Sequence, residues 1–236
     1  MQCHLELIDI TKSYKDKLAL DHFSYRFDAG IYGLLGPNGA GKSTLMNIIT
    51  QNLKSDEGRI LFNGEDVRKL GQRYLSHIGY MPQQQALYEN LTLIRFMYYI
   101  AALKGMKKKE ADEQIERMLN DVGLWEERSR NMGGFSGGMK QRALVAQALL
   151  GNPDIIILDE PTAGLDPIQR IGVREMIKGL AEDRIVMIST HVIADIEAIA
   201  KEILVLRQGK LLKEQPLRTG GSNEESLEEM YIRLFG

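Results

Sequence analysis

This chain of 236 residues has a single cysteine, almost no net charge and no long apolar run. Because Cys3 has no second cysteine to pair with, the fold cannot depend on an internal disulfide, which favours a reducing compartment. The net charge of -2 at pH 7 excludes a strong basic field, and the short basic run 107–109 is followed by acidic residues. Nucleic acid is therefore not expected as a partner.

A membrane-spanning segment is also missing from the sequence. A spanning helix needs about 20 consecutive apolar residues, whereas the longest candidate, residues 91–103, is shorter and contains Arg95. The N-terminal residues lack the basic and apolar regions of a secretory signal peptide. We therefore expect a cytoplasmic chain that is peripheral at the inner face of the cell membrane and reaches it only through another protein.

A glycine-rich segment is the first feature that points to a function. It fits the pattern G-x-x-x-x-G-K-[ST] and consists of Gly36, Pro37, Asn38, Gly39, Ala40, Gly41, Lys42 and Ser43. The apolar run 30–35 before it predicts a buried strand, and residues 42–49 after it predict a helix. In that context the glycines let backbone N–H groups point at phosphate oxygens, and the helix N-terminus adds a favourable dipole. The alternative, a chance glycine-rich turn, does not explain the flanking strand and helix.

Three residues of this segment have individual expected roles. Lys42 is expected to reach the β- and γ-phosphates of a nucleotide, and the Ser43 hydroxyl to ligate Mg²⁺. Thr44 extends the same phosphate-binding site into the helix. The segment therefore predicts a phosphate loop.

Two acidic residues follow a second apolar run. Ile155–Leu158 is typical of a buried parallel strand, and Asp159 and Glu160 stand at its carboxyl end, where open α/β sheets bind ligands. Asp159 is expected to hold Mg²⁺ through water, and Glu160 to orient and polarise an attacking water. Alone, this Asp-Glu-Pro sequence could equally end a strand and begin a turn, but the phosphate loop upstream favours the catalytic interpretation.

A third segment combines small residues with the start of a helix. Phe135 is followed by Ser136, Gly137, Gly138 and Met139, and strong helix formers continue to residue 149. Ser136 is a good N-cap, so the segment predicts a second helix N-terminus that could cradle a phosphate. The alternative is a capped core helix preceded by a Gly-Gly hinge.

With these motifs in this order, the chain resembles the nucleotide-binding subunit of an ABC transporter over residues 5–209. The segment 135–142 is similar to the family's LSGGQ signature. It departs from that pattern at Phe135, where Leu is usual, and at Met139, where Gln is usual. Because Ser136–Gly138 is intact, we expect activity to survive both changes.

The resemblance implies a fold and an assembly. The fold is an α/β P-loop NTPase core with a mostly parallel sheet, an N-terminal antiparallel β region and an inserted helical subdomain. The nucleotide is ATP with Mg²⁺. Two ATPase subunits, identical or different, pack head-to-tail, so that each ATP lies between one phosphate loop and the other subunit's signature. The pair drives a transmembrane permease subunit.

The resemblance also implies roles for four residues elsewhere. Gln83 matches the Q-loop glutamine that contacts Mg²⁺ and the attacking water, although the two glutamines after it leave the register open by one. His191, after the apolar run 185–190, matches the switch histidine at the γ-phosphate, and Asp166 matches the D-loop residue at the dimer interface. Tyr14 matches the aromatic residue that stacks on adenine, with packing against the sheet as its alternative.

The remaining patterns suggest how the chain is organised. We expect 1–236 to form one ABC ATPase domain, with 86–150 as its helical subdomain and 219–236 as a linker and short C-terminal helix. Helical periodicity continues over 192–200, and residues 203–206 predict an edge strand. An apolar surface is a candidate groove for the permease, with ordinary core as the alternative; it consists of Ala86, Leu87, Tyr88, Leu91 and Phe96.

Two functions from different classes fit these motifs. The first is an ATPase subunit that drives a permease, and the motif style resembles the export branch for drugs, peptides or lipids. The second is a non-transport ABC-type ATPase in translation or DNA maintenance, but such chains usually carry two motif sets, a long coiled coil or zinc modules. A catalytically inactive regulator is disfavoured because Lys42, Asp159, Glu160 and His191 are all present.

Overall fold

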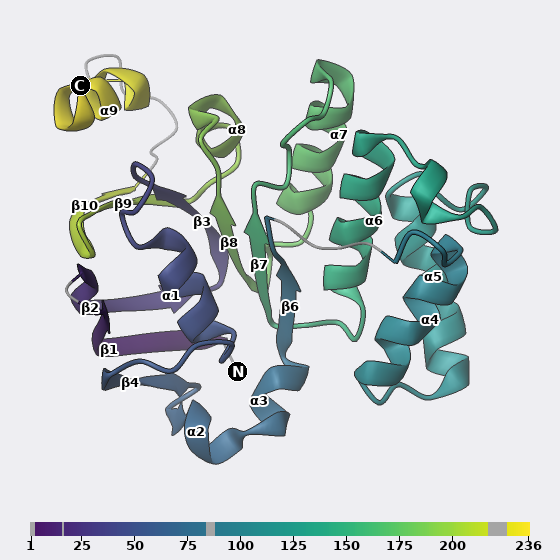
Figure 1. The fold of residues 1–236 in the computed structure, drawn as a ribbon, viewed down its shortest axis with the longest axis horizontal. Coiled ribbons are helices and arrows are strands. Elements are labelled where there is room, and N and C mark those ends of the chain that lie inside the picture. The colour runs from purple at the N-terminus through teal and green to yellow at the C-terminus, as the bar shows by residue number, and fades with distance from the viewer. Residues whose placement is uncertain (1–2, 16, 84–87, 217–225) are drawn as a thin grey trace.

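The computed structural model describes residues 3–15, 17–83, 88–216 and 226–236, which form two sheets with helices around them (Figure 1). The strands of the larger sheet are, in spatial order, β10 (Lys210–Pro216), β9 (Glu202–Arg207), β3 (Gly30–Leu35), β8 (Ile185–Ser189), β7 (Ile155–Asp159) and β6 (Ile78–Met81). Neighbours from β9 to β6 are parallel, and β10 is antiparallel to β9. This mostly parallel sheet confirms the predicted α/β fold class.

The interior strands are covered on both faces because their sequences are almost entirely apolar. Every residue of β3, β7 and β8 is buried. Side chains alternate along β7, so that Ile155 and Ile157 belong to one core cluster while Ile156 and Leu158 belong to the other. Since these strands are parallel, the residues that follow them meet at one edge of the sheet.

The predicted antiparallel region forms the smaller sheet, which contains β2 (Lys17–Asp28), β1 (His4–Tyr14), β4 (Glu57–Phe62) and β5 (Glu65–Asp66) in this order. Asn63 and Gly64 join β4 to β5 with φ angles of 51° and 83°, as expected for a tight hairpin. Helix α1 (Lys42–Ile49) lies between the two sheets and buries Leu45 and Ile49 in their shared core (Figure 1). Two short helices, α2 (Val67–Leu70) and α3 (Gln72–Ser76), then lead to β6.

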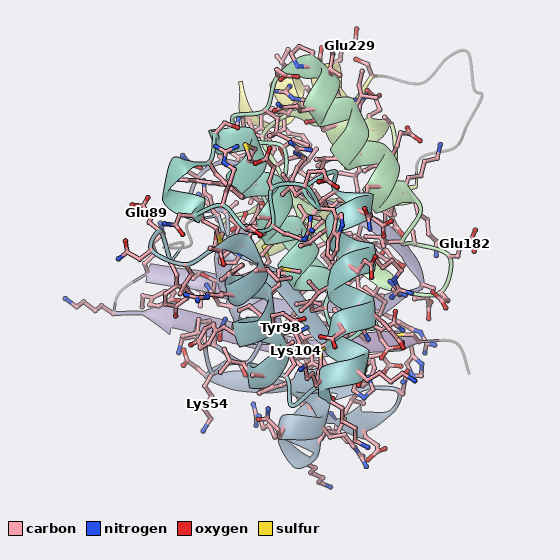
Figure 2. The ribbon with its side chains drawn as sticks, turned by 90° about the vertical axis from the view of Figure 1, so that its right-hand side faces the viewer. Lys54, Glu89, Tyr98, Lys104, Glu182 and Glu229 are labelled. Carbon is pink, nitrogen blue, oxygen red and sulfur yellow. The ribbon has the colours of Figure 1, made fainter. Side chains whose placement is uncertain are left out.

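A helical layer stands between β6 and β7 in the chain. It contains α4 (Leu93–Leu103), α5 (Lys108–Asp121), a 3-10 turn (Met132–Gly134) and α6 (Gly137–Leu149). Figure 2 looks onto this layer, with Tyr98 and Lys104 near its middle. Of the candidate groove residues, Phe96 is fully buried and belongs to the core, Tyr88 is exposed, and Ala86 and Leu87 lie outside the described residues.

The C-terminal part differs from the sequence expectation in two places. Strand β9 is not an edge strand, because Ile203–Leu206 is buried on both faces and β10 pairs with its outer side. The helix predicted over 192–200 is the shorter α8 (Ile193–Glu197). Helix α7 (Pro167–Lys178), absent from the prediction, starts immediately after Asp166.

The predicted C-terminal helix is α9 (Leu227–Phe235), while residues 219–225 of the predicted linker lie outside the described residues. None of the helices within the described ranges combines the length and apolarity needed to cross a membrane.

Candidate active site

A cavity of about 750 Å³ opens where the parallel strands end. Its walls come from segments that are far apart in the sequence: the loop after β3, the residues after β6, β7 and β8, the N-terminal hairpin and α9. The lining residues are Tyr14, Lys17, Ala19, Gly36, Pro37, Asn38, Gly39, Ala40, Gly41, Lys42, Ser43, Thr44, Gln83, Asp159, Glu160, Ser189, Thr190, His191 and Tyr231. The whole predicted phosphate loop therefore shares one cavity with the predicted acidic pair, Gln83, His191 and Tyr14.

The loop between β3 and α1 can take its shape only with glycine at certain positions. Gly36 has a φ of 149°, and a Cβ there would lie 2.3 Å from the Leu206 carbonyl oxygen. Gly41, the N-cap of α1, has a φ of 113° and approaches the Ala19 carbonyl in the same way. The loop is thus pressed against β9 and β2. Lys42 Nζ donates to the carbonyls of Gly36 at 2.5 Å and Pro37 at 3.3 Å, which holds its ammonium inside the turn.

Lys42 and Asp159 are poorly solvated in the cavity. Burial lowers the pKa of the Lys42 ammonium, and the nearby Asp159 and Glu160 carboxylates oppose that shift. Burial likewise raises the pKa of the Asp159 carboxyl, a shift that a hydrogen bond with Ser189 opposes and the charge of Glu160 reinforces. A buried cation beside buried carboxylates suits a polyanionic ligand that carries a divalent cation, because each charge then finds a partner.

Glu160 has an unusual backbone conformation. Its φ of 55° lies in the left-handed region, which side-chain-bearing residues seldom adopt and which costs roughly 1–2 kcal/mol. Its N–H donates to the Ser189 carbonyl at 2.7 Å, and its carbonyl accepts from Gln141 Nε2 at 2.6 Å. These bonds hold the turn that directs the carboxylate away from β7 and into the cavity.

The Glu160 carboxylate is paired with His191. Its Oε1 accepts from the His191 backbone N–H at 3.1 Å and lies 3.0 Å from His191 Nδ1. Nδ1 is also 2.9 Å from Oε2, so the imidazole lies against both carboxylate oxygens. His191 therefore holds the carboxylate in place, while the His191 side chain, 76% exposed, extends outward.

Four residues predicted to touch nucleotide do not line this cavity. Ser136 caps α6 through a hydrogen bond from the Met139 N–H at 3.3 Å, and both Ser136 and Gly137 are exposed. Gly138 is buried, because the Gln169 side chain of α7 lies 2.2 Å from where its Cβ would be. Asp166 caps α7 by accepting from the Gln169 N–H at 2.9 Å.

Sequence reasoning missed several residues that the fold brings to the cavity. Lys17 and Ala19 arrive from β2, and Tyr231 arrives from α9. Gln141 does not line the cavity but bonds to Glu160 from the signature helix. Gln141 alone gave a signal in the sequence, through its place in the signature segment 135–142. The contact itself depends on how α6 packs beside β7.

Comparison with known proteins agrees with this geometry. A family model described as ABC transporter matches residues 20–163. A bacitracin transport ATP-binding protein of Bacillus licheniformis is 38% identical over 219 residues, covering 92% of this chain and 71% of the relative. A lantibiotic transport ATP-binding protein of Streptococcus pyogenes is 35% identical over 229 residues, covering 96% of this chain and 95% of the relative.

The fold is also similar to the folds of solved ATP-binding cassettes. A dimeric ATP-binding cassette in a post-hydrolysis state, bound to ADP and phosphate, superposes with a TM-score of 0.82 at 28% identity, covering 92% of this chain and 100% of that one. The family match extends over more than half of this chain and includes the phosphate loop, the signature and the acidic pair. The chain therefore belongs to the ABC transporter family as one of its ATP-binding, ATP-hydrolysing subunits.

Proposed function

We propose that the cavity at the carboxyl edge of the larger sheet is the ATPase site and that the residues gathered in it carry out hydrolysis. The observation that supports this most directly is the meeting of Lys42, Asp159, Glu160 and His191 in one cavity although they come from three separate segments of the chain. Lys42 and the loop N–H groups bind the phosphates. Tyr14, 48% exposed at the rim of the cavity, offers an aromatic ring on which adenine can stack.

Glu160 is proposed as the residue that aligns and polarises the attacking water. Its backbone is held at both N–H and carbonyl, and its carboxylate is held by His191, so the carboxylate is oriented before substrate arrives. His191 and Gln83, both exposed residues of the cavity, keep the geometry at the γ-phosphate. The reaction is in-line attack of water on the γ-phosphorus, which yields ADP and phosphate.

The residues present fit a magnesium ion. Asp159 and Ser43 supply oxygen ligands of the kind that Mg²⁺ prefers, and Gln83 adds a carbonyl oxygen. A cation would give the buried carboxyl groups of Asp159 and Glu160 a charge partner. When bound, the ion would neutralise phosphate charge.

A second subunit is proposed to complete each site. Ser136 and Gly137 form an exposed helix N-terminus that lies outside the cavity of their own chain. A head-to-tail pair places this signature against the phosphates of the other subunit, with Asp166 at the interface. The dimeric relative with ADP and phosphate supports such a pair.

A transmembrane permease is the proposed second partner. Tyr88 and Tyr99 are exposed, 48% and 41%, and their rings meet edge to face at 5.3 Å, forming an aromatic surface beside the helical layer. We propose that this surface receives the permease and holds the chain at the inner face of the cell membrane. The relatives named for bacitracin and lantibiotic transport favour an exported peptide-like compound.

The first test of the site is Lys42→Ala. Removing the ammonium is expected to abolish nucleotide binding or turnover, because the Gly36 and Pro37 carbonyls hold this cation inside the loop turn. Binding is measured by titration calorimetry with MgATP, and turnover by phosphate release. Unchanged ATPase activity would refute the site.

Affinity purification of the tagged chain from detergent-solubilised membranes tests the permease partner. A stoichiometric multi-span protein, identified by mass spectrometry, is the expected result. Recovery with ribosomes or DNA-binding proteins instead would move the chain to the non-transport alternative. Tyr99→Ala should weaken recovery of the permease. Tyr98→Ala is the matched control and should leave recovery unchanged.

A further inference from the structure

The C-terminal helix α9 is specified by its own sequence and anchored to the core. Ser226 and Glu229 form a reciprocal capping box, with the Ser226 N–H donating to Glu229 Oε2 at 3.0 Å and the Glu229 N–H donating to Ser226 Oγ at 3.2 Å. Leu227 and Met230 are buried in the core cluster that includes Ile196 of α8. The helix is therefore a docked element of the fold rather than a loose end.

The docking places α9 beside the phosphate loop and the switch histidine. Arg207, at the end of β9, donates from Nη1 to the Leu234 carbonyl at 3.1 Å, and its guanidinium lies 5.9 Å from the centre of the Phe235 ring. The residue before it, Leu206, contacts Gly36 of the phosphate loop. Helix α8, which follows His191, packs against α9, and Figure 1 shows both helices near the carboxyl ends of the strands.

Tyr231 is the side chain through which α9 reaches the cavity. Among the residues of α9, all of which the structure describes, it alone lines the cavity that contains Lys42 and Glu160. It is half-buried, and the Phe235 ring holds it at a centroid distance of 4.7 Å. The matched family segment ends at residue 163, so Tyr231 lies outside the part of the chain that the family model covers.

We infer that Tyr231 is a nucleotide-contacting residue and that α9 is a nucleotide-responsive wall of the ATP site. This inference rests on the ATPase site proposed above. An aromatic ring with a hydroxyl offers both a packing face and a hydrogen-bonding group to a bound nucleotide. Because coupling between two binding events is reciprocal, ATP stabilises the docked position of α9, and docked α9 strengthens ATP binding.

The test is the affinity for a non-hydrolysable ATP analogue with Mg²⁺, measured by titration calorimetry. Tyr231→Ala is expected to weaken binding roughly fivefold to tenfold. Ile232→Ala is the matched control on the same helix, because Ile232 is 67% exposed and does not line the cavity, and its affinity should equal that of the unchanged chain. Circular dichroism and thermal unfolding without nucleotide establish that both variants fold.

Hydrogen exchange of the α9 amides is a second readout. The analogue is expected to slow exchange in α9 of the unchanged chain and to have no effect in Lys42→Ala. Suppose that Lys42→Ala loses binding, that Tyr231→Ala binds normally, and that the analogue leaves the exchange rates of the α9 amides unchanged. The inference about Tyr231 and α9 is then wrong, whereas the proposed ATPase site is supported. If Lys42→Ala still binds the analogue normally, the proposed site is wrong and the inference fails with it.

Discussion

Glu160 shows how the surroundings of one residue prepare it for its proposed role. Its left-handed backbone costs free energy and is held by β8 through the Ser189 carbonyl and by α6 through Gln141. The His191 N–H holds its carboxylate. Such strain is tolerated where the rest of the fold fixes the conformation, as is frequent in active sites. This backbone conformation turns the Glu160 carboxylate away from the axis of β7 and toward the cavity.

The variant Glu160→Gln separates binding from hydrolysis. The amide keeps an oxygen for the His191 N–H but is a poor base, so hydrolysis should fall at least about a hundredfold while MgATP still binds. The ATP-bound dimer should then accumulate, as measured by size exclusion with MgATP. A variant that stays monomeric and hydrolyses ATP at the normal rate would contradict the role of Glu160.

Gln141 should act on catalysis through the Glu160 backbone. Both Gln141→Ala and Gln141→Glu lose the donor to the Glu160 carbonyl, and we expect kcat to fall roughly tenfold or more because a small misplacement of the carboxylate is costly. The KM for ATP should change little. Gln147→Ala is the matched control, since Gln147 donates to the Tyr80 carbonyl from the same helix at 2.8 Å. If substitution of Gln141 and substitution of Gln147 lower kcat and thermal stability to the same extent, Gln141 has only a structural role.

At the scale of elements, Lys104 joins the helical layer to the larger sheet. It caps the end of α4, and its Nζ donates to the Leu150 carbonyl after α6 and to the Ile78 carbonyl at the start of β6, at 2.5 and 3.4 Å (Figure 2). Burial lowers the pKa of this ammonium to about 8. The contact that links these elements therefore carries a titratable charge.

This charge predicts a pH dependence of stability. The folded pKa of Lys104 is about 8 and the ordinary value is 10.5, so the unfolded chain binds more protons between these values. Stability should therefore rise as the pH rises through that window, by about 2 kcal/mol between pH 7.5 and 9.5 from this group. Urea unfolding at both pH values, compared with Lys104→Met, isolates the effect. The same pH slope in both proteins would show that Lys104 does not titrate there.

At the scale of the whole molecule, the proposed site is incomplete in one chain. The signature at the start of α6 and Asp166 at the start of α7 adjoin each other through Gly138 and Gln169, but neither lines the cavity. They form an exposed surface of helix N-termini on the same molecule that carries the phosphate loop. Two copies placed head-to-tail would use both surfaces at once.

Mixing two inactive variants tests this reciprocal arrangement. Lys42→Ala removes the phosphate-loop cation, whereas Ser136→Asp keeps an N-cap residue but puts a negative charge where the partner's phosphates would lie. Each alone should be inactive. An equal mixture should recover about a quarter of normal ATPase activity, because half the dimers have one intact site of two. No recovery, with both variants folded and Glu160→Gln dimeric, would exclude head-to-tail pairing of two copies.

The sequence by itself determined the motifs, the family and most elements of the fold. The phosphate loop, the strand before Asp159 and the cap at Ser136 depend on residues close together in the chain, so periodicity and turn chemistry predict them. The position of β9 inside the sheet was not predictable in this way, because an apolar run looks similar at an edge and in the interior.

Only the tertiary structure decided which distant residues share the cavity. The bond from Gln141 to Glu160 depends on α6 packing beside β7, and the place of Tyr231 depends on Arg207 and the core contacts of α9. The left-handed turn at Glu160 is likewise stabilised by groups from other elements. These contacts join segments that are separated by many residues in the chain. The local sequence does not predict them, because the packing of the complete fold sets the distances between those segments.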